Sequence, residues 1–239
     1  RLAGTLRDRF SSDMTIAVGP TMNEVRSRLL EAHGNVDELL AALDDIIRFV
    51  ATVSGLAQEN MTRGTGWLFL DLGRRIERAQ FVLRAALGPW QQSPIDWDAA
   101  MRLALELCDS SITYRWRYLG QLEPAPVLDL VVLDDSNPRA FAFQLRSIAS
   151  HLERLGQASG TRVPDLLAPL EKELAETVRL FGGEESAWRH EGLALGRLRD
   201  IVSDSLQRLD ELSAQITRAY FSHVPAAQAV GSTPAMAAS

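Results

Sequence analysis

A dense group of charged side chains surrounds a predicted helix in the first third of the chain. The stretch from 60 to 87 opens with the turn Arg63-Gly64-Thr65-Gly66 and continues with apolar residues at spacings of three and four, the period of one helix face. The charged residues in it are Arg63, Asp71, Arg74, Arg75, Glu77 and Arg78. This set is compatible with an internal polar network, a site for a carboxylate or phosphate, or a solvated helix face.

Spacing within this group favours the internal network. Asp71 with Arg75, and Arg74 with Glu77, stand at helical pair spacings, where exposed ion pairs contribute only about 0.3–0.5 kcal/mol each. Gly66 and Gly73 share a face, so a second helix could approach Glu77 closely. A buried Glu77 would need a partner, because an unpaired buried carboxylate is costly. Glu77 is therefore also the candidate general acid or base, should the chain have catalytic activity.

The other motifs give no support for a metal, a nucleotide or a nucleophile. The loop at Gly64-Thr65-Gly66 lacks the spacing and the lysine of a phosphate-binding loop, and Thr65 is better interpreted as a helix cap. The histidines lack a partner at ligand spacing, and Cys108 lies in an apolar run typical of a core. We therefore expect no bound metal and no cofactor.

A second group, Tyr114-Arg115-Trp116-Arg117-Tyr118, interleaves aromatic and cationic side chains. Such a pattern occurs on nucleic-acid-binding and ligand-binding surfaces. The favoured interpretation is a helix end that packs Trp116, with the arginines facing the negative end of the helix dipole.

Net charge, apolar runs and cysteine content exclude or disfavour several classes of protein. The chain has 239 residues and a net charge of −6, which gives no support for nucleic-acid binding. No apolar run reaches the roughly 18 residues of a membrane span. A single cysteine excludes an intrachain disulfide framework and predicts a reducing, cytoplasmic location. Because the chain begins at Arg1 inside a helical pattern, we expect a fragment of a longer polypeptide or a trimmed protein.

Apolar periodicity predicts an all-α bundle of about seven or eight helices, with no sheet. Asn35 and Asp96 are predicted N-caps, and Ser136 or Asn137 with Pro138 predicts another helix start. Residues 1–223 are expected to form one helical domain, followed by a disordered tail at 224–239. The predicted helical segments cover 1–18, 21–33, 36–59, the stretch up to 87, 97–119, 138–155, 164–181 and 184–222, and the short apolar element at 127–133 is also expected to be helical.

Several blocks of this sequence resemble the bacterial alpha-E domain, an all-helical family named for a Glu-Arg motif. The blocks that carry the resemblance within the charged helix are Met61-Thr62-Arg63-Gly64, Gly66-Trp67, Leu70, Leu72-Gly73-Arg74 and Ile76-Glu77-Arg78-Ala79. Further matching blocks are Leu6-Arg7 with Ser11-Ser12, residues 131–139, Phe143 to Leu145, His151-Leu152 and Ala219-Tyr220-Phe221. The family usually carries an earlier copy of the Glu-Arg helix, and this chain begins after the point where that copy would lie.

The resemblance implies partners. Members of the alpha-E family occur fused to, or encoded beside, circularly permuted ATP-grasp proteins, often together with transglutaminase-like proteins. It thus implies a helical partner or accessory domain of a peptide ligation or modification system. Together with the absence of nucleophile, metal and nucleotide motifs, it favours a domain without catalytic activity of its own over an enzyme. In that hypothesis the Arg63–Arg78 group holds a polar core or binds a peptide or carboxylate. The alternative is an enzyme that uses Glu77 as general acid or base on an anionic, peptide-like substrate, and a domain that serves only to oligomerise is a further possibility.

Overall fold

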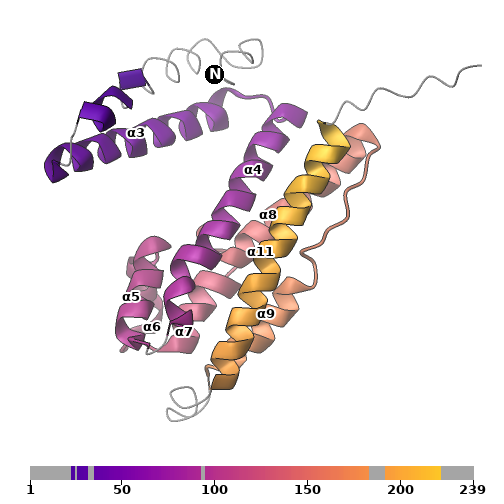
Figure 1. The fold of residues 1–239 in the computed structure, drawn as a ribbon. Coiled ribbons are helices and arrows are strands. Elements are labelled where there is room, and N and C mark those ends of the chain that lie inside the picture. The colour runs from indigo at the N-terminus through magenta and orange to yellow at the C-terminus, as the bar shows by residue number, and fades with distance from the viewer. Residues whose placement is uncertain (1–22, 25, 32–34, 93–94, 183–191, 222–239) are drawn as a thin grey trace, which may run out of the picture. The chain divides into compact units, whose positions relative to one another are not determined.

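The computed structural model describes residues 23–24, 26–31, 35–92, 95–182 and 192–221, and every regular element in them is helical (Figure 1). The prediction of an all-α fold is confirmed. The chain divides into one unit that ends at Arg75 and another that begins at Ile76. The predicted helix at 1–18, the first residues of the one at 184–222 and the tail at 224–239 lie outside the described residues. None of the described helices combines the length and the apolarity needed to cross a bilayer.

From α3 onward, the described residues form a series of helices in chain order. The α-helices are α3 (Val36–Asn60), α4 (Thr65–Phe81), α5 (Trp97–Leu107), α6 (Ser111–Tyr118), α7 (Pro124–Leu128), α8 (Phe141–Ser159), α9 (Leu170–Arg179) and α11 (Gly192–Tyr220). A π-helical turn, Val82–Ala86, and a 3-10 turn, Gly88–Gln91, follow α4, and a second π-helical turn, Asp129–Leu133, follows α7.

Local capping chemistry sets the start of two helices where it was predicted. The Asn35 side-chain oxygen accepts the N–H of Asp37 at 3.1 Å and begins α3. The Asp96 carboxylate accepts the N–H of Ala99 at 3.0 Å and begins α5. Thr65 is the first residue of α4 rather than its cap.

The core of the second unit lies around the two π-helical turns. Both are closed by the i→i+5 bond of a π-helix, from Leu87 N–H to the Val82 carbonyl at 3.1 Å and from Asp134 N–H to the Asp129 carbonyl at 2.9 Å. Helix α5 packs against the first turn and against α7, while α8 and α9 pack against the second. Helix α11 packs along α9. A T-shaped aromatic cluster of Trp90, Trp97 and Phe181 fills one end of this core.

The single helix predicted over 97–119 is two helices, which corrects the sequence interpretation. Asp109 has φ of +47°, in the left-handed region that a helix interior does not tolerate, and it separates α5 from α6. The N–H of Ser110 bonds to the Leu105 carbonyl at 2.8 Å, and its hydroxyl donates to the Cys108 carbonyl at 2.8 Å. The turn therefore satisfies its own polar groups, although Ser110 is buried.

Two further helix starts differ from prediction. Helix α8 begins at Phe141, after a hydrogen-bonded turn at 134–140, so neither Ser136 nor Asn137 caps it. Helix α9 begins at Leu170, because Asp165 forms a local turn by accepting the N–H of Leu167 at 3.0 Å. In both cases a short polar side chain bonds within the turn instead of capping the next helix.

Candidate functional site

Asp71 is the buried acid of the charged group on α4. It is 3% exposed, its Oδ2 accepts from Arg75 Nε at 3.1 Å, and its Oδ1 lies 3.5 Å from Arg74 Nη1. The Arg75 side chain is 22% exposed and that of Arg74 is 41% exposed. A buried carboxylate with charge-assisted partners is a structural ion-pair arrangement.

The two outer arginines of the group bind locally. Arg63 donates to the Gln58 carbonyl at 2.6 Å, and its guanidinium carbon lies 4.6 Å from the centre of the Trp67 ring. The guanidinium carbon of Arg78 lies 5.7 Å from the centre of the Phe81 ring. Both are cation–π distances. The guanidinium groups of Arg63 and Arg78 are thus engaged with their own neighbours in sequence.

Glu77 is exposed to solvent. At about 100° per residue it lies about 120° around the helix from Asp71, whereas Arg75 and Arg78 share the side of Asp71. A Cβ built at Gly66 or Gly73 would meet nothing within 4 Å in the described part of the chain. The close helix approach expected at Glu77 is therefore absent there. The structure brings Asp71, Arg74 and Arg75 together and leaves Glu77 apart from them.

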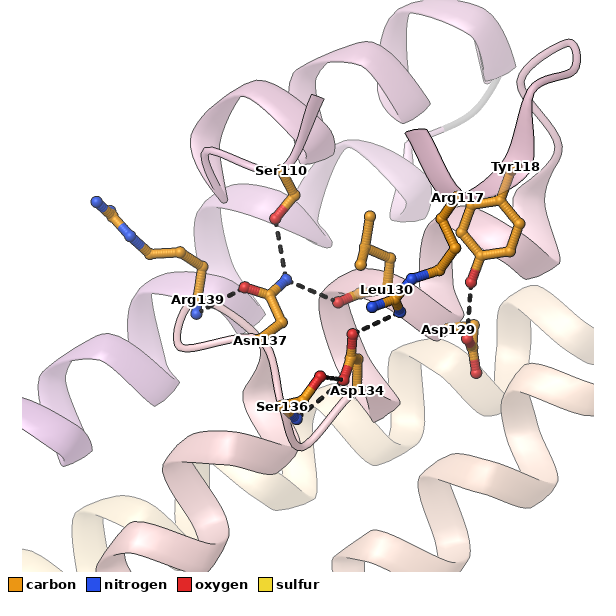
Figure 2. A network of polar contacts seen from close by, with 9 residues as sticks. All are labelled: Ser110, Arg117, Tyr118, Asp129, Leu130, Asp134, Ser136, Asn137 and Arg139. Carbon is orange, nitrogen blue, oxygen red and sulfur yellow. Dashed lines mark hydrogen bonds and ion pairs between the residues drawn. The ribbon is translucent and has the colours of Figure 1, made fainter. Parts of the chain in front are cut away.

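A second polar group, which the sequence did not predict as one network, fills the turn between the second π-helical turn and α8 (Figure 2). Asp134 Oδ1 accepts from the Ser136 N–H at 2.9 Å and from the Ser136 hydroxyl at 2.6 Å. Its other oxygen accepts from Arg117 at 2.6 Å. Tyr118 donates to Asp129 at 2.9 Å, and Arg117 and Tyr118 together join the end of α6 to this turn.

Asn137 connects this turn to the rest of the second unit. Figure 2 shows its side chain between Ser110 and Leu130, and its Nδ2 donates to the Ser110 hydroxyl and to the Leu130 carbonyl, both at 3.0 Å. Its Oδ1 accepts the N–H of Arg139 at 3.0 Å. One amide thereby joins the α5–α6 turn, the π-helical turn and the start of α8. The sequence signal for it, Asp134-Asp135-Ser136-Asn137-Pro138, predicted a helix cap because a tertiary partner cannot be deduced from local sequence.

Asp134 is held ionised by its neighbours. Burial alone would raise its pKa, but the hydrogen bonds from Ser136 and Arg117 outweigh burial and hold the pKa of the carboxyl below its usual value. A depressed carboxyl pKa stabilises the fold above the pKa of the unfolded chain, and the contribution is lost as pH falls through the folded pKa. The network of Figure 2 therefore stabilises the fold by connecting the elements that meet at this turn.

Cys108 is a buried thiol of the core. It is 1% exposed, and burial raises the pKa of its thiol to about 11, against the smaller opposing effects of Arg78 and Arg139. The thiol is thus protonated at neutral pH. Among the described residues no cluster of histidine, cysteine and carboxylate side chains is arranged to hold a metal ion.

An open groove of about 860 Å³ lies beside α5 and α6. Its other walls are residues 120–125, which end in the first two residues of α7, and Phe181 and Gly182 after α9. Trp116 lies outside it and is 82% exposed, so the expectation that Trp116 packs at the helix end is wrong. Tyr114 is the buried aromatic residue of this helix.

Comparisons with known proteins found a family model and curated relatives that match most of this chain. A family model named Alpha-E, described as a predicted alpha-helical domain with a conserved ER motif, matches residues 1–221. An uncharacterized protein of Mycobacterium bovis and one of Mycobacterium tuberculosis are each 31% identical over 169 residues, which are 68% of this chain and 19% of each relative. The chain therefore spans about a fifth of the length of these curated relatives. No solved structure matches it significantly.

Proposed function

Since the chain belongs to the Alpha-E family of helical domains, we propose that it is a non-catalytic module of a larger peptide ligation or modification system. In this proposal its principal partner is a circularly permuted ATP-grasp protein, fused to it or separate, and a transglutaminase-like protein is a further partner. These partners are what the family resemblance implies. The relatives' much greater length is in keeping with a module that works beside other domains.

The observation that carries the non-catalytic part of the proposal is the placement of Glu77. A general acid or base works best where burial and a fixed hydrogen-bond partner tune it to its task. Glu77 is instead exposed, and no described residue bonds to its carboxylate. The buried acid of the same helix is Asp71, whose two ion pairs give it a structural role. The alternative of an enzyme with Glu77 at its centre is thereby disfavoured.

The partner is tested by a direct binding measurement. The 239-residue chain is mixed with the separately purified ATP-grasp protein encoded in the same genome, and complex formation is followed by sedimentation velocity. We expect a stoichiometric complex with a dissociation constant of about 1 µM or lower, equivalent to about 8 kcal/mol of binding free energy. If the two proteins sediment separately at about 100 µM, near the weak limit of specific recognition, the proposed partnership is wrong.

A further inference from the structure

The groove beside α5 and α6 has the form of a binding site. None of the residues drawn in Figure 2 lines it, so it is separate from the polar network. Met101 and Leu105 are buried and supply apolar surface, and three aromatic residues, Trp97, Tyr114 and Phe181, contribute to its walls. Its volume of about 860 Å³ falls within the usual range of ligand sites, about 300–1,000 Å³.

The walls of the groove are fixed by contacts of the fold. The Tyr114 hydroxyl donates to the Gln121 carbonyl and accepts the Glu123 N–H, each at 3.2 Å, so the connection between α6 and α7 is tied to α6. At the other end, the rings of Trp97 and Phe181 meet with centres 6.5 Å apart. A ligand that enters a preformed groove loses less affinity to ordering of the protein.

The charged residues at the groove favour a cationic ligand. Three carboxylates line it, those of Asp98, Glu106 and Glu123, against two guanidinium groups, those of Arg102 and Arg115. Asp98 and Arg102 neutralise each other through bonds of 2.6 and 3.2 Å. In the described part of the chain neither Glu106 nor Glu123 forms an ion pair. With Arg115 counted against Glu106 and Glu123, the lining keeps one net negative charge, and aromatic walls attract cations as well as apolar groups.

We propose that this groove binds an extended polypeptide segment in which a lysine or arginine stands next to an apolar residue. Glu106 and Glu123 supply the negative charge for the basic side chain, while Met101 and Leu105 supply the apolar surface. An acidic peptide or a nucleotide is disfavoured, because its charge would meet these two carboxylates. The inference deepens the proposed function and rests on it for the source of the peptide, which is the substrate presented to the ligase.

The test measures peptide binding by the 239-residue chain through fluorescence anisotropy. One labelled hexapeptide alternates lysine with phenylalanine or leucine, and a matched peptide has glutamate in place of each lysine. We expect the lysine peptide to bind at least about tenfold more tightly than the glutamate peptide. The double variant Glu106→Gln, Glu123→Gln is expected to weaken binding of the lysine peptide by about tenfold.

A matched control distinguishes binding in the groove from general electrostatic attraction between a basic peptide and an acidic protein. Glu153 is an exposed carboxylate on α8 that does not line the groove, so Glu153→Gln should leave the dissociation constant within about twofold. Equal binding of both peptides, equal loss in the control variant, or no binding of the lysine peptide at about 1 mM overturns the inference. A chain that forms the ATP-grasp complex but does not bind the lysine peptide refutes the groove inference and leaves the proposed function standing.

Discussion

Replacing Trp90 with alanine is expected to lower the free energy of unfolding of the second unit by about 3–5 kcal/mol. Trp90 is fully buried, and its ring meets those of Trp97 and Phe181 edge-on, with centres 5.9 and 6.1 Å away. Truncation removes the largest fully buried side chain of the described residues and leaves a cavity that the surrounding helices cannot fill completely. No hydrogen bond is lost with it, because the indole N–H has no acceptor among the described residues.

Trp116→Ala is the matched control for this substitution. It removes the same side chain from a position that is 82% exposed, so the free energy of unfolding should change by no more than about 0.5 kcal/mol. Urea titrations followed by far-ultraviolet circular dichroism measure both variants. A loss below about 1 kcal/mol for Trp90→Ala, or equal losses for the two variants, would show that the aromatic cluster is not a core element.

Asn137→Ala is expected to cost about 2–4 kcal/mol of folding free energy. The substitution removes the bonds to the Ser110 hydroxyl, the Leu130 carbonyl and the Arg139 N–H. Each hydrogen bond contributes about 1 kcal/mol net, and a buried carbonyl left unpaired costs about 1–3 kcal/mol. Leu130 is fully buried, so water cannot readily replace the lost donor.

Ser136→Ala in the same turn provides the comparison for Asn137→Ala. Ser136 is exposed, and in the described structure its hydroxyl donates only to Asp134. Ser136→Ala is therefore expected to cost about 1 kcal/mol of folding free energy or less. Chemical denaturation measures Asn137→Ala, Ser136→Ala, Ser110→Ala and the double variant Asn137→Ala with Ser110→Ala. The coupling energy is the loss in the double variant minus the sum of the losses for Asn137→Ala and Ser110→Ala. A coupling of about 0.5 kcal/mol or more supports direct contact between Asn137 and Ser110, and strictly additive losses contradict it.

The sequence predicted those parts of the fold that depend on local chemistry. The all-α class follows from apolar periodicity, and the caps at Asn35 and Asp96 act within three residues of themselves. The break between α5 and α6 was missed because it depends on the left-handed backbone of Asp109, which the apolar pattern of the helix conceals. The sequence predicts Ser136 or Asn137 as a helix cap, whereas the Asn137 side chain bonds to Leu130 and to Ser110, which lies 27 residues earlier.

The sequence predicted which residues belong to the candidate site, but not how they are arranged. The sequence placed Asp71, Arg74, Arg75 and Glu77 on one helix, but which of the two acids is buried depends on how that helix packs. The sequence analysis groups Arg63 and Arg78 with these four residues by charge. In the structure, the guanidinium group of Arg63 lies over the Trp67 ring and that of Arg78 over the Phe81 ring. The groove could not be inferred at all, because its lining comes from four separate segments and contains no motif.

The non-catalytic role is tested most directly by the rate of ATP-dependent ligation in the intact system with Glu77→Gln. A residue that acts as general acid or base typically contributes about 10²–10⁴-fold to the rate. Because Glu77 is exposed and stands apart from the Asp71 ion pairs, we predict a rate within about twofold of the unmodified system. A fall of about 100-fold or more in a variant whose fold and complex formation are intact would contradict the account and place Glu77 in the chemistry.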